Sequence, residues 1–383
     1  MRGEPCLKSR LVVVTDPSPH PAAPHPVVLD PGASSLELTR QLCDIGSVSG
    51  DEGPIADAIE AAARTAAHLE VTRVGDTVVA RTMLGRDRRV VLAGHIDTVP
   101  VNGNLPTHPL VVDGEEHLWG RGTVDMKAGV AVQLKLAVEL AEPVFDVTWL
   151  WYDHEEVGEE HNGLRRLALT HPELMEGDFA ILGEPSNGQI EGGCNGTLRA
   201  EIRTRGVRAH SARAWMGHNA IHDAAEILQV LQSYRPREID VDGLRYREGL
   251  NAVGIAGGVA GNVIPDECVV QVNYRFAPSR SLAEATAHVV ELFEGFDVRV
   301  VDAAAGARPG LDAPLAQEFI AAVGATPQPK YGWTDVARFS ALGIPAVNFG
   351  PGDPSKAHAD DESVPVAQIV AAEESLRTWL SRA

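Results

Sequence analysis

The sequence predicts an α/β protein with a mostly parallel sheet and helices on both faces, into which a ferredoxin-like α+β domain is inserted. Over most of the chain, segments with apolar residues at helical spacing alternate with short apolar runs rich in β-branched residues. That alternation is typical of a parallel sheet covered by helices. The middle of the chain instead follows the order β-α-β-β-α-β, which is that of a ferredoxin-like module. With 383 residues, the chain is long enough for two hydrophobic cores.

The N-terminal residues 1–34 are expected to form a proline-rich arm outside the folded domains. The run DPSPHPAAPHPVVLDPGA carries prolines that cannot stand inside helices or central strands. Its two histidines, His20 and His25, are metal-ligand types, but a solvated tail is the expected state of such a segment. The folded part is expected to begin near Ser35.

The larger domain is expected to comprise residues 35–193 and 304–383. Short apolar runs predict its strands at 90–93, 144–152, 179–183 and 344–349. Helical spacing predicts its helices at 36–46, 54–66, 312–324 and 366–380, and a long helix that starts at Asp125.

The inserted domain is expected at residues 194–303. Leu198, Ala200 and Ile202 alternate with charged residues, as in a strand with one buried face. The elements expected after this strand are a helix at 218–234, strands at 250–259 and 267–276, a helix at 281–296 and a strand at 297–301.

Composition excludes several classes of partner. Lys and Arg total 33 against 53 Asp and Glu, and the net charge of -20 would repel a nucleic-acid backbone. No run approaches the roughly 18 to 20 apolar residues of a membrane-spanning helix, so a membrane is not expected either. The four cysteines are far apart and form no Cys-x-x-Cys pair. Free thiols and a cytoplasmic location are therefore expected.

Histidines and carboxylates follow several predicted strands at the point where each strand ends. In open α/β sheets, ligands bind beyond the carboxyl ends of the strands. Imidazoles together with carboxylates suit a borderline metal such as zinc. The sequence therefore predicts a two-metal hydrolase site, built from these residues and Asp125: His95, Asp97, Glu155, Glu156, Glu184 and His358.

Local geometry suggests different roles within this set. Asp97 follows His95 by two residues, so its carboxylate is expected to orient that imidazole. Glu155 and Glu156 should point to opposite sides of an extended chain, so that one binds metal while the other serves as a general base. The alternative for this pair is a solvated acidic turn. One carboxylate can serve two ions, and Asp125 is the candidate; its alternative is a helix cap.

The motifs GHIDTVP, WGRGTVDMKAG, EEVG, GEPS, RAHSA and AHADDE resemble those of the di-zinc exopeptidase and aminoacylase family. The resemblance covers about residues 36–383 and implies that two Zn²⁺ ions are bound, for which Co²⁺ or Mn²⁺ can substitute. It implies that Asp125 bridges the ions, with His95 and Glu184 on one and Glu156 and His358 on the other. It further implies that Glu155 is the general acid and base, that Asp97 is the partner of His95, and that a cis peptide bond follows Asp125.

The resemblance also implies residues outside the metal centre. His210 matches a histidine that reaches the active site from the lid of a partner subunit, which implies a homodimer formed through the lid; alternatively, it merely ends a lid strand. Arg275 on the wet face of QVNYRF, Asn262 in GNVIP, and Thr334 match residues that contact the substrate. The alternative for these three is a surface arginine and ordinary loops.

Within the family, residues 332–362 look most like those of desuccinylases. This implies a small-molecule substrate, N-succinyl-LL-2,6-diaminopimelate, hydrolysed to succinate and LL-2,6-diaminopimelate. Alternatives are an acetylornithine deacetylase, a related N-acyl amino acid hydrolase or dipeptidase, or a non-catalytic binding homologue. The presence of Glu155 with every matched ligand argues against the last, because so much buried negative charge has no purpose in a mere binder.

Overall fold

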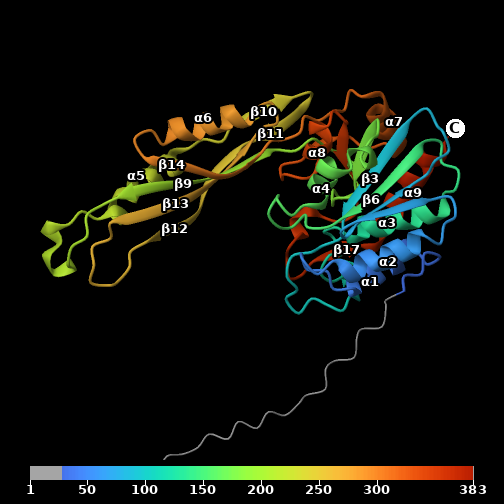
Figure 1. Ribbon diagram of the computed structural model, residues 1–383, viewed down its shortest axis with the longest axis horizontal. Coiled ribbons are helices and arrows are strands. Elements are labelled where there is room, and N and C mark those ends of the chain that lie inside the picture. The colour runs from blue at the N-terminus through green and yellow to red at the C-terminus, as the bar shows by residue number, and fades with distance from the viewer. Residues whose placement is uncertain (1–27, 383) are drawn as a thin grey trace, which may run out of the picture.

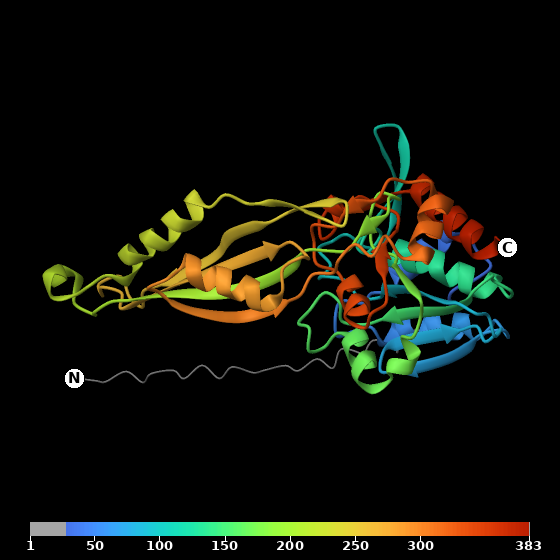
Figure 2. The same cartoon turned by 90° about the horizontal axis from the view of Figure 1, so that it is seen from above.

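The computed structural model describes residues 28–382 and has two lobes: a thick body and an elongated lid that extends from one side of it (Figures 1 and 2). Most of the predicted arm, with His20, His25 and Cys6, lies outside the described residues. The end of the arm is described, and there Leu29 is buried in the core of the body. Within the described part, no helix is both long and apolar enough to span a membrane.

The body is built on an eight-stranded mixed sheet whose central strands are parallel, as the sequence predicts. The strand β3 pairs in parallel with β6 and β7, and β7 pairs in parallel with β16. The strands lie in the order β1 (Glu70–Val74), β2 (Thr77–Arg81), β6 (Asp146–Tyr152), β3 (Arg89–His95), β7 (Phe179–Leu182), β16 (Ala346–Asn348), β8 (Glu191–Gly192) and β15 (Gln328–Pro329).

Both faces of this sheet are buried under helices. Alternate residues of β3 show this, because Val90 and Leu92 belong to one core cluster while Val91 and Ala93 belong to another. The first face is covered by α1 (Ser35–Asp44), α2 (Gly53–Ala63), α3 (Lys127–Glu139), α7 (Pro314–Val323) and α9 (Val366–Ser381). The second is covered by α4 (Gly163–Thr170) and α8 (Val336–Ala341). Because both faces of the sheet are covered, the residues of a central strand are buried on either side, and the strand is an unbroken apolar run in the sequence.

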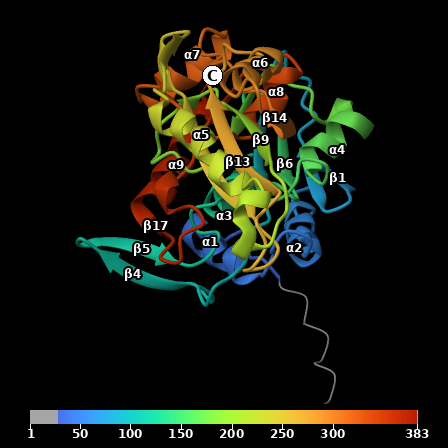
Figure 3. The same cartoon turned by 90° about the vertical axis from the view of Figure 1, so that its left-hand side faces the viewer.

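A smaller three-stranded sheet borders the body. It has the order β17 (Ser363–Pro365), β5 (Glu115–Trp119), β4 (His108–Val112), and the β4–β5 hairpin projects away from the rest (Figure 3). Its edge strand β17 leads directly into α9. This sheet therefore places the segment before α9 next to the segment before α3.

The lid is a four-stranded antiparallel sheet with two helices, in the order β12 (Gly249–Gly257), β13 (Glu267–Phe276), β9 (Gly196–Arg205), β14 (Asp297–Ala304). The helices are α5 (Ala220–Ser233) and α6 (Leu282–Leu292), and α6 begins with a capping box formed by Ser281 and Glu284. The predicted β-α-β-β-α-β order is therefore correct. The limits predicted for this domain, 194 and 303, stay a prediction.

The two lobes are joined by a short neck, which we define as the antiparallel bridge between Cys194 and Ala307. The N–H of each residue donates to the carbonyl of the other, at 3.0 and 3.1 Å. A side chain at Gly193 would lie 2.2 Å from the carbonyl oxygen of Ala307, and one at Gly306 would lie 2.5 Å from that of Cys194. The neck therefore requires glycine at both positions.

Several elements were not predicted. They are the helices α4 and α8, the short strands β8 and β15, the β1–β2 hairpin, the β4–β5–β17 sheet and a lid hairpin of β10 (Glu238–Val241) and β11 (Leu244–Arg247). Short 3-10 turns also occur at Pro172–Leu174, Ser211–Met216 and Pro354–Lys356. The reading of Asp125 as a helix cap is wrong, because Met126 is the N-cap of α3 and no side chain caps it.

Candidate metal centre

Four segments converge at the carboxyl ends of the central strands. His95 is the last residue of β3, Glu155 and Glu156 follow β6, Glu184 follows β7, and His358 follows β16. Because β3, β6, β7 and β16 run parallel, their carboxyl ends meet at the same edge of the sheet. Asp125 joins them from the turn before α3, and the peptide bond after it is cis, as the resemblance implied.

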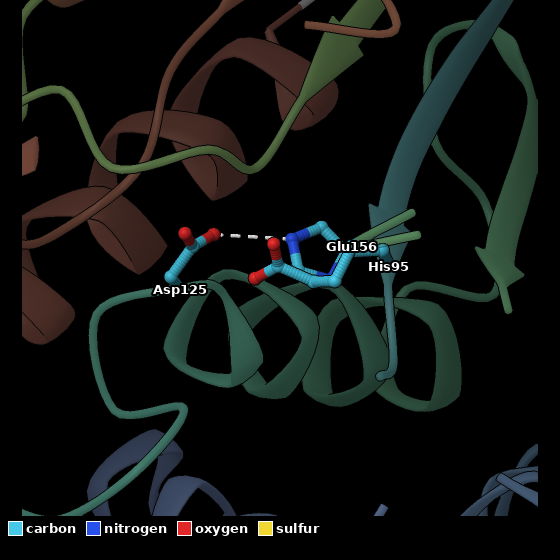
Figure 4. Close-up of side chains that lie close together, drawn as sticks. All are labelled: His95, Asp125 and Glu156. Carbon is cyan, nitrogen blue, oxygen red and sulfur yellow. Dashed lines mark hydrogen bonds and ion pairs between the residues drawn. The ribbon is translucent and has the colours of Figure 1, made fainter. Parts of the chain in front are cut away.

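Asp125 lies between the two histidines. Its Oδ1 is 3.1 Å from Nε2 of His95, and its Oδ2 is 3.3 Å from Nε2 of His358 (Figure 4 shows the first contact). Glu156 Oε2 lies 3.0 Å from the same His358 nitrogen. Ligand atoms of His95, Asp125 and Glu156 all lie within 4.8 Å of one another. Asp125 thus presents a separate oxygen to each histidine.

Glu184 completes the set of carboxylates. It is buried, and within the described residues its Oε1 atom has no hydrogen-bond partner. Burial and the nearby Asp125 raise the pKa of Glu184 to about 7. A buried acceptor without a donor is costly, and a cation satisfies it. The residues of this centre therefore fit divalent metal ions in both their chemistry and their placement.

The carboxylate of Asp97 contacts both His95 and the backbone of the loop that carries Glu155 and Glu156. Its carboxylate accepts hydrogen bonds from the backbone N–H of Glu155 at 3.0 Å and of Glu156 at 3.1 Å, and from Ser49 Oγ at 2.6 Å. Nδ1 of His95 lies 3.5 Å from the Asp97 carboxylate and 3.1 Å from its carbonyl oxygen. Asp97 thus lies beside His95 and also holds the backbone of the two glutamates.

Glu155 lines the site without a hydrogen-bond partner for its side chain among the described residues. Burial, reinforced by the charges of Asp335 and Glu184, raises its pKa well above the ordinary value, although His95 opposes this. The prediction assumed an extended chain here, but the backbone turns at His154, whose φ is 59°. A partly buried carboxyl group with a raised pKa takes up a proton more readily than an exposed one, which suits a group that accepts and returns a proton.

Two cavities meet at these residues. One of about 410 Å³ is lined by the centre and by Lys330, Tyr331 and Thr334. The other, of about 560 Å³, runs toward Arg199 and Arg338. Glu155, Glu156 and Trp333 line both. The two cavities therefore open onto the same acidic residues.

The lid residues singled out in the sequence do not reach this centre within the chain. His210 and Asn262 are neighbours, because the N–H of Ser211 donates to the carbonyl of Asn262 at 2.9 Å. The turn Ser211–Met216 lies at the end of the lid farthest from the body (Figure 1). Arg275 lies nearer the neck, where its Nε donates to Asn273 Oδ1 at 3.1 Å. Of the residues predicted to contact substrate, Thr334 alone lines a cavity at the centre; its Oγ1 donates to Asn348 Oδ1 at 3.2 Å.

Sequence reasoning missed several charged residues close to the centre. Lys330 is buried, and its Nζ lies 2.7 Å from Glu191 and 3.1 Å from the carbonyl oxygen of Pro185, the residue after Glu184. Arg121 and Glu362 form a buried ion pair with a separation of 2.7 Å. The last two stand inside recognised motifs, but neither was assigned a role.

Comparison with known proteins agrees with this centre. Residues 91–382 match the model of "Peptidase family M20/M25/M40". The chain is 48% identical to the succinyl-diaminopimelate desuccinylase of Corynebacterium glutamicum, over 92% of this chain and 98% of that protein. It is 53% identical to a Mycobacterium tuberculosis protein with a provisional name of the same kind, over 92% and 99% of the two chains.

Solved structures share the fold at low identity. A tripeptidase of Staphylococcus aureus has a TM-score of 0.74 at 21% identity, covering 90% of this chain and 96% of that chain. A Bacillus subtilis protein described as a dinuclear metal-binding peptidase has a TM-score of 0.66 at 17% identity, covering 90% and 96%. With most of its length matched in sequence and fold, the chain belongs to peptidase family M20/M25/M40 and is a metal-dependent hydrolase.

Proposed function

We propose that this protein is a succinyl-diaminopimelate desuccinylase. It hydrolyses N-succinyl-LL-2,6-diaminopimelate to succinate and LL-2,6-diaminopimelate. The substrate assignment is supported by 48% identity to the succinyl-diaminopimelate desuccinylase of Corynebacterium glutamicum across nearly the whole of both chains. The reaction is supported by the acid and imidazole centre at the carboxyl ends of β3, β6, β7 and β16.

Two Zn²⁺ ions are the proposed cofactors, and Co²⁺ or Mn²⁺ can replace them. His95, Asp125 and Glu184 would hold one ion, while Asp125, Glu156 and His358 would hold the other. When bound, the ions polarise the amide carbonyl and lower the pKa of a water molecule. The support for two ions is the position of Asp125, with one oxygen toward each histidine.

Glu155 is the proposed proton carrier. Water adds to the amide carbonyl carbon while the Glu155 carboxylate takes a proton from it. The C–N bond then breaks, and Glu155 delivers the proton to the departing amine nitrogen, so that succinate and the free amine result. Its raised pKa supports this role, because the carboxylate is then a stronger base toward water, while the departing amine is more basic still and can take the proton back from it.

The two cavities suit the two arms of this substrate. One arm is the succinyl group with a single carboxylate, and the other is a longer amino acid with a zwitterionic end. The larger cavity presents both charge signs, in Arg199, Arg338, Glu159 and Asp302. Thr334 in the smaller cavity is a proposed donor to a substrate carboxylate, to which its hydroxyl would turn from Asn348. Arg275 and Asn262 are proposed contacts made by the lid.

A homodimer formed through the lid is part of the proposal. The strand β12 lies at the edge of the lid sheet, and its Val253 and Ile255 are 61% and 55% exposed. The neighbouring helix α5 exposes Ile221 and Leu228. An open, apolar edge strand invites pairing with a second strand. A second copy of the lid would cover this surface and bring its distal His210 toward the metal centre of the other subunit.

Hydrolysis assays test the function directly. The zinc-loaded protein should release succinate from N-succinyl-LL-2,6-diaminopimelate much faster than it releases acetate from N-acetylornithine or cleaves simple dipeptides. Brisk deacetylation without succinate release would overturn the substrate assignment. Glu155→Gln should retain two ions and lose turnover. The cytoplasm is the proposed compartment, where the buried free thiols of Cys43, Cys194 and Cys268 would stay reduced.

A further inference from the structure

A buried carboxylate behind the metal centre holds the backbone of the bridging residue. Glu362 is fully buried, and its Oε1 accepts the N–H of Asp125 at 3.1 Å and that of Val124 at 2.9 Å. Its Oε2 lies 2.7 Å from Nη1 of Arg121. One carboxylate therefore ties the peptide group of Asp125 to a guanidinium.

The same guanidinium contacts the opposite side of the centre. Nη2 of Arg121 donates to the carbonyl oxygen of His358 at 3.4 Å. His358 has a positive φ of 66°, so its backbone adopts a conformation that few residues favour without support. Arg121 and Glu362 together thus connect the backbone of Asp125 with that of His358, the two residues that face each other across one proposed ion site.

The pair is not needed to keep these two chain segments together. Backbone pairing of β5 with β17 already joins them, with Trp119 opposite Ser363, and the N–H of Gly120 donates to the carbonyl of Glu362 at 3.0 Å. Burying two charges carries a large desolvation cost before their attraction is counted. The buried pair also places one more carboxylate, that of Glu362, beside the acidic residues of the metal centre. A purely structural tie between the segments would be made more favourably by apolar side chains.

We propose that Arg121 and Glu362 are a positioning pair that fixes Asp125 relative to His358 and so sets the spacing of the two metal ions. The inference rests on the proposed two-metal centre. Neither side chain is a ligand or touches the substrate cavities among the described residues. Loss of such an outer contact typically weakens metal binding about 10- to 100-fold. The expected effect is on the second ion, because its site needs both Asp125 and His358 at the correct separation.

The test compares Glu362→Gln and Arg121→Met with a matched control, Glu248→Gln. Glu248 is also a buried carboxylate that pairs with an arginine, Arg237 at 2.9 Å, and accepts a backbone N–H, but it lies in the lid. Each metal-free protein is titrated with Zn²⁺ by calorimetry and with Co²⁺ by visible absorption, which reports the coordination of the metal. Thermal unfolding of each protein is followed in parallel.

We expect the wild type and Glu248→Gln to bind two ions. Both variants of the pair should bind the first ion as the wild type does and the second about 10- to 100-fold more weakly, with an altered Co²⁺ spectrum. Two ions bound with wild-type affinity in both folded variants would overturn the inference, as would loss of both ions together. If the wild type itself binds fewer than two ions, it is the proposed function that fails.

If Glu362→Gln and Arg121→Met do not fold, Arg121→Lys is tested in their place. A lysine keeps a positive charge opposite Glu362 but cannot also reach the carbonyl of His358 with a second donor arm. This variant should fold and weaken the second ion selectively. If it fails to fold, or binds both ions normally, the pair has no positioning role.

Discussion

The proposed dimer predicts that two inactive variants restore each other's activity. His210→Ala removes the lid histidine and keeps the metal centre, whereas Glu155→Gln keeps His210 and removes the proton carrier. His210 lies at the distal end of the lid, and within one chain it does not line the cavities of the metal centre. A working site would then combine the Glu155 of one subunit with the His210 of the other.

The magnitude follows from counting sites. Random exchange of subunits makes half of the dimers mixed. In a mixed dimer, one site joins an intact metal centre to an intact His210, and the other site lacks both groups. An equimolar mixture should therefore recover about one quarter of wild-type activity in a two-fold symmetric dimer.

Succinate release is measured before and after the two variants are mixed, exchanged and allowed to re-equilibrate. Each variant alone should stay near its background, and Glu155→Gln mixed with metal-free wild-type protein controls for transfer of zinc. A mixture that remains as inactive as its components, although mixed dimers are detected by native mass spectrometry, would refute the trans role of His210.

Three further predictions concern metal, packing and pH. Removal of metal by a chelator should abolish turnover and lower the melting temperature, because the ions bind the folded state alone; added Zn²⁺ should restore both. Trp379→Ala should cost about 3 to 5 kcal/mol of unfolding free energy in urea titrations, because this indole packs against Phe145 and other aromatic rings in the core. Replacement of Trp215, which is 81% exposed, should change stability by less than about 0.5 kcal/mol. Burial opposes ionisation of Asp146, but backbone N–H groups of Leu84 and Arg86 outweigh it and lower its pKa. Its contribution is therefore present above the unfolded pKa of about 4 and is lost as pH falls through the lower folded value, and Asp146→Asn should flatten acid unfolding curves in that window.

The central strands could be predicted because their burial on two faces leaves an unmistakable apolar run, as in Val90 to Ala93. The hairpin strands were not predicted, although two hairpins carry a local signal. Segment 70–74 pairs with 77–81 across Gly75-Asp76, and 108–112 pairs with 115–119 across Asp113-Gly114, a residue pair typical of tight hairpin turns. The pairing of 115–119 with 363–365, in contrast, joins segments far apart in the chain and leaves little local signal.

The metal centre likewise contains some residues that could be predicted from the sequence and others that could not. Imidazoles and carboxylates indicate metal binding by their residue type alone, so His95, Asp125 and His358 could be selected as candidate ligands from the sequence. Arg121 and Lys330 look like any surface cations in a sequence. Their importance depends on burial and on the atoms they contact, which appear only in the folded structure.

The neck between Cys194 and Ala307 is short compared with the lid, so a small rotation at the neck would move the far end of the lid a long way. Both chain connections cross at this bridge, and beside it the lid hairpin β10–β11 also contacts the body, where Tyr246 Oη donates to the carbonyl of Gly192 at 2.5 Å. A swing of the lid would turn about this junction. The ten residues of β9 alone extend about 33 Å from it, and a rotation of about 10° would displace the far end of the strand by about 6 Å. Small changes in backbone angle near Gly193 and Gly306 would thus displace the far end of the lid by several ångströms, although these glycines lie at its opposite end.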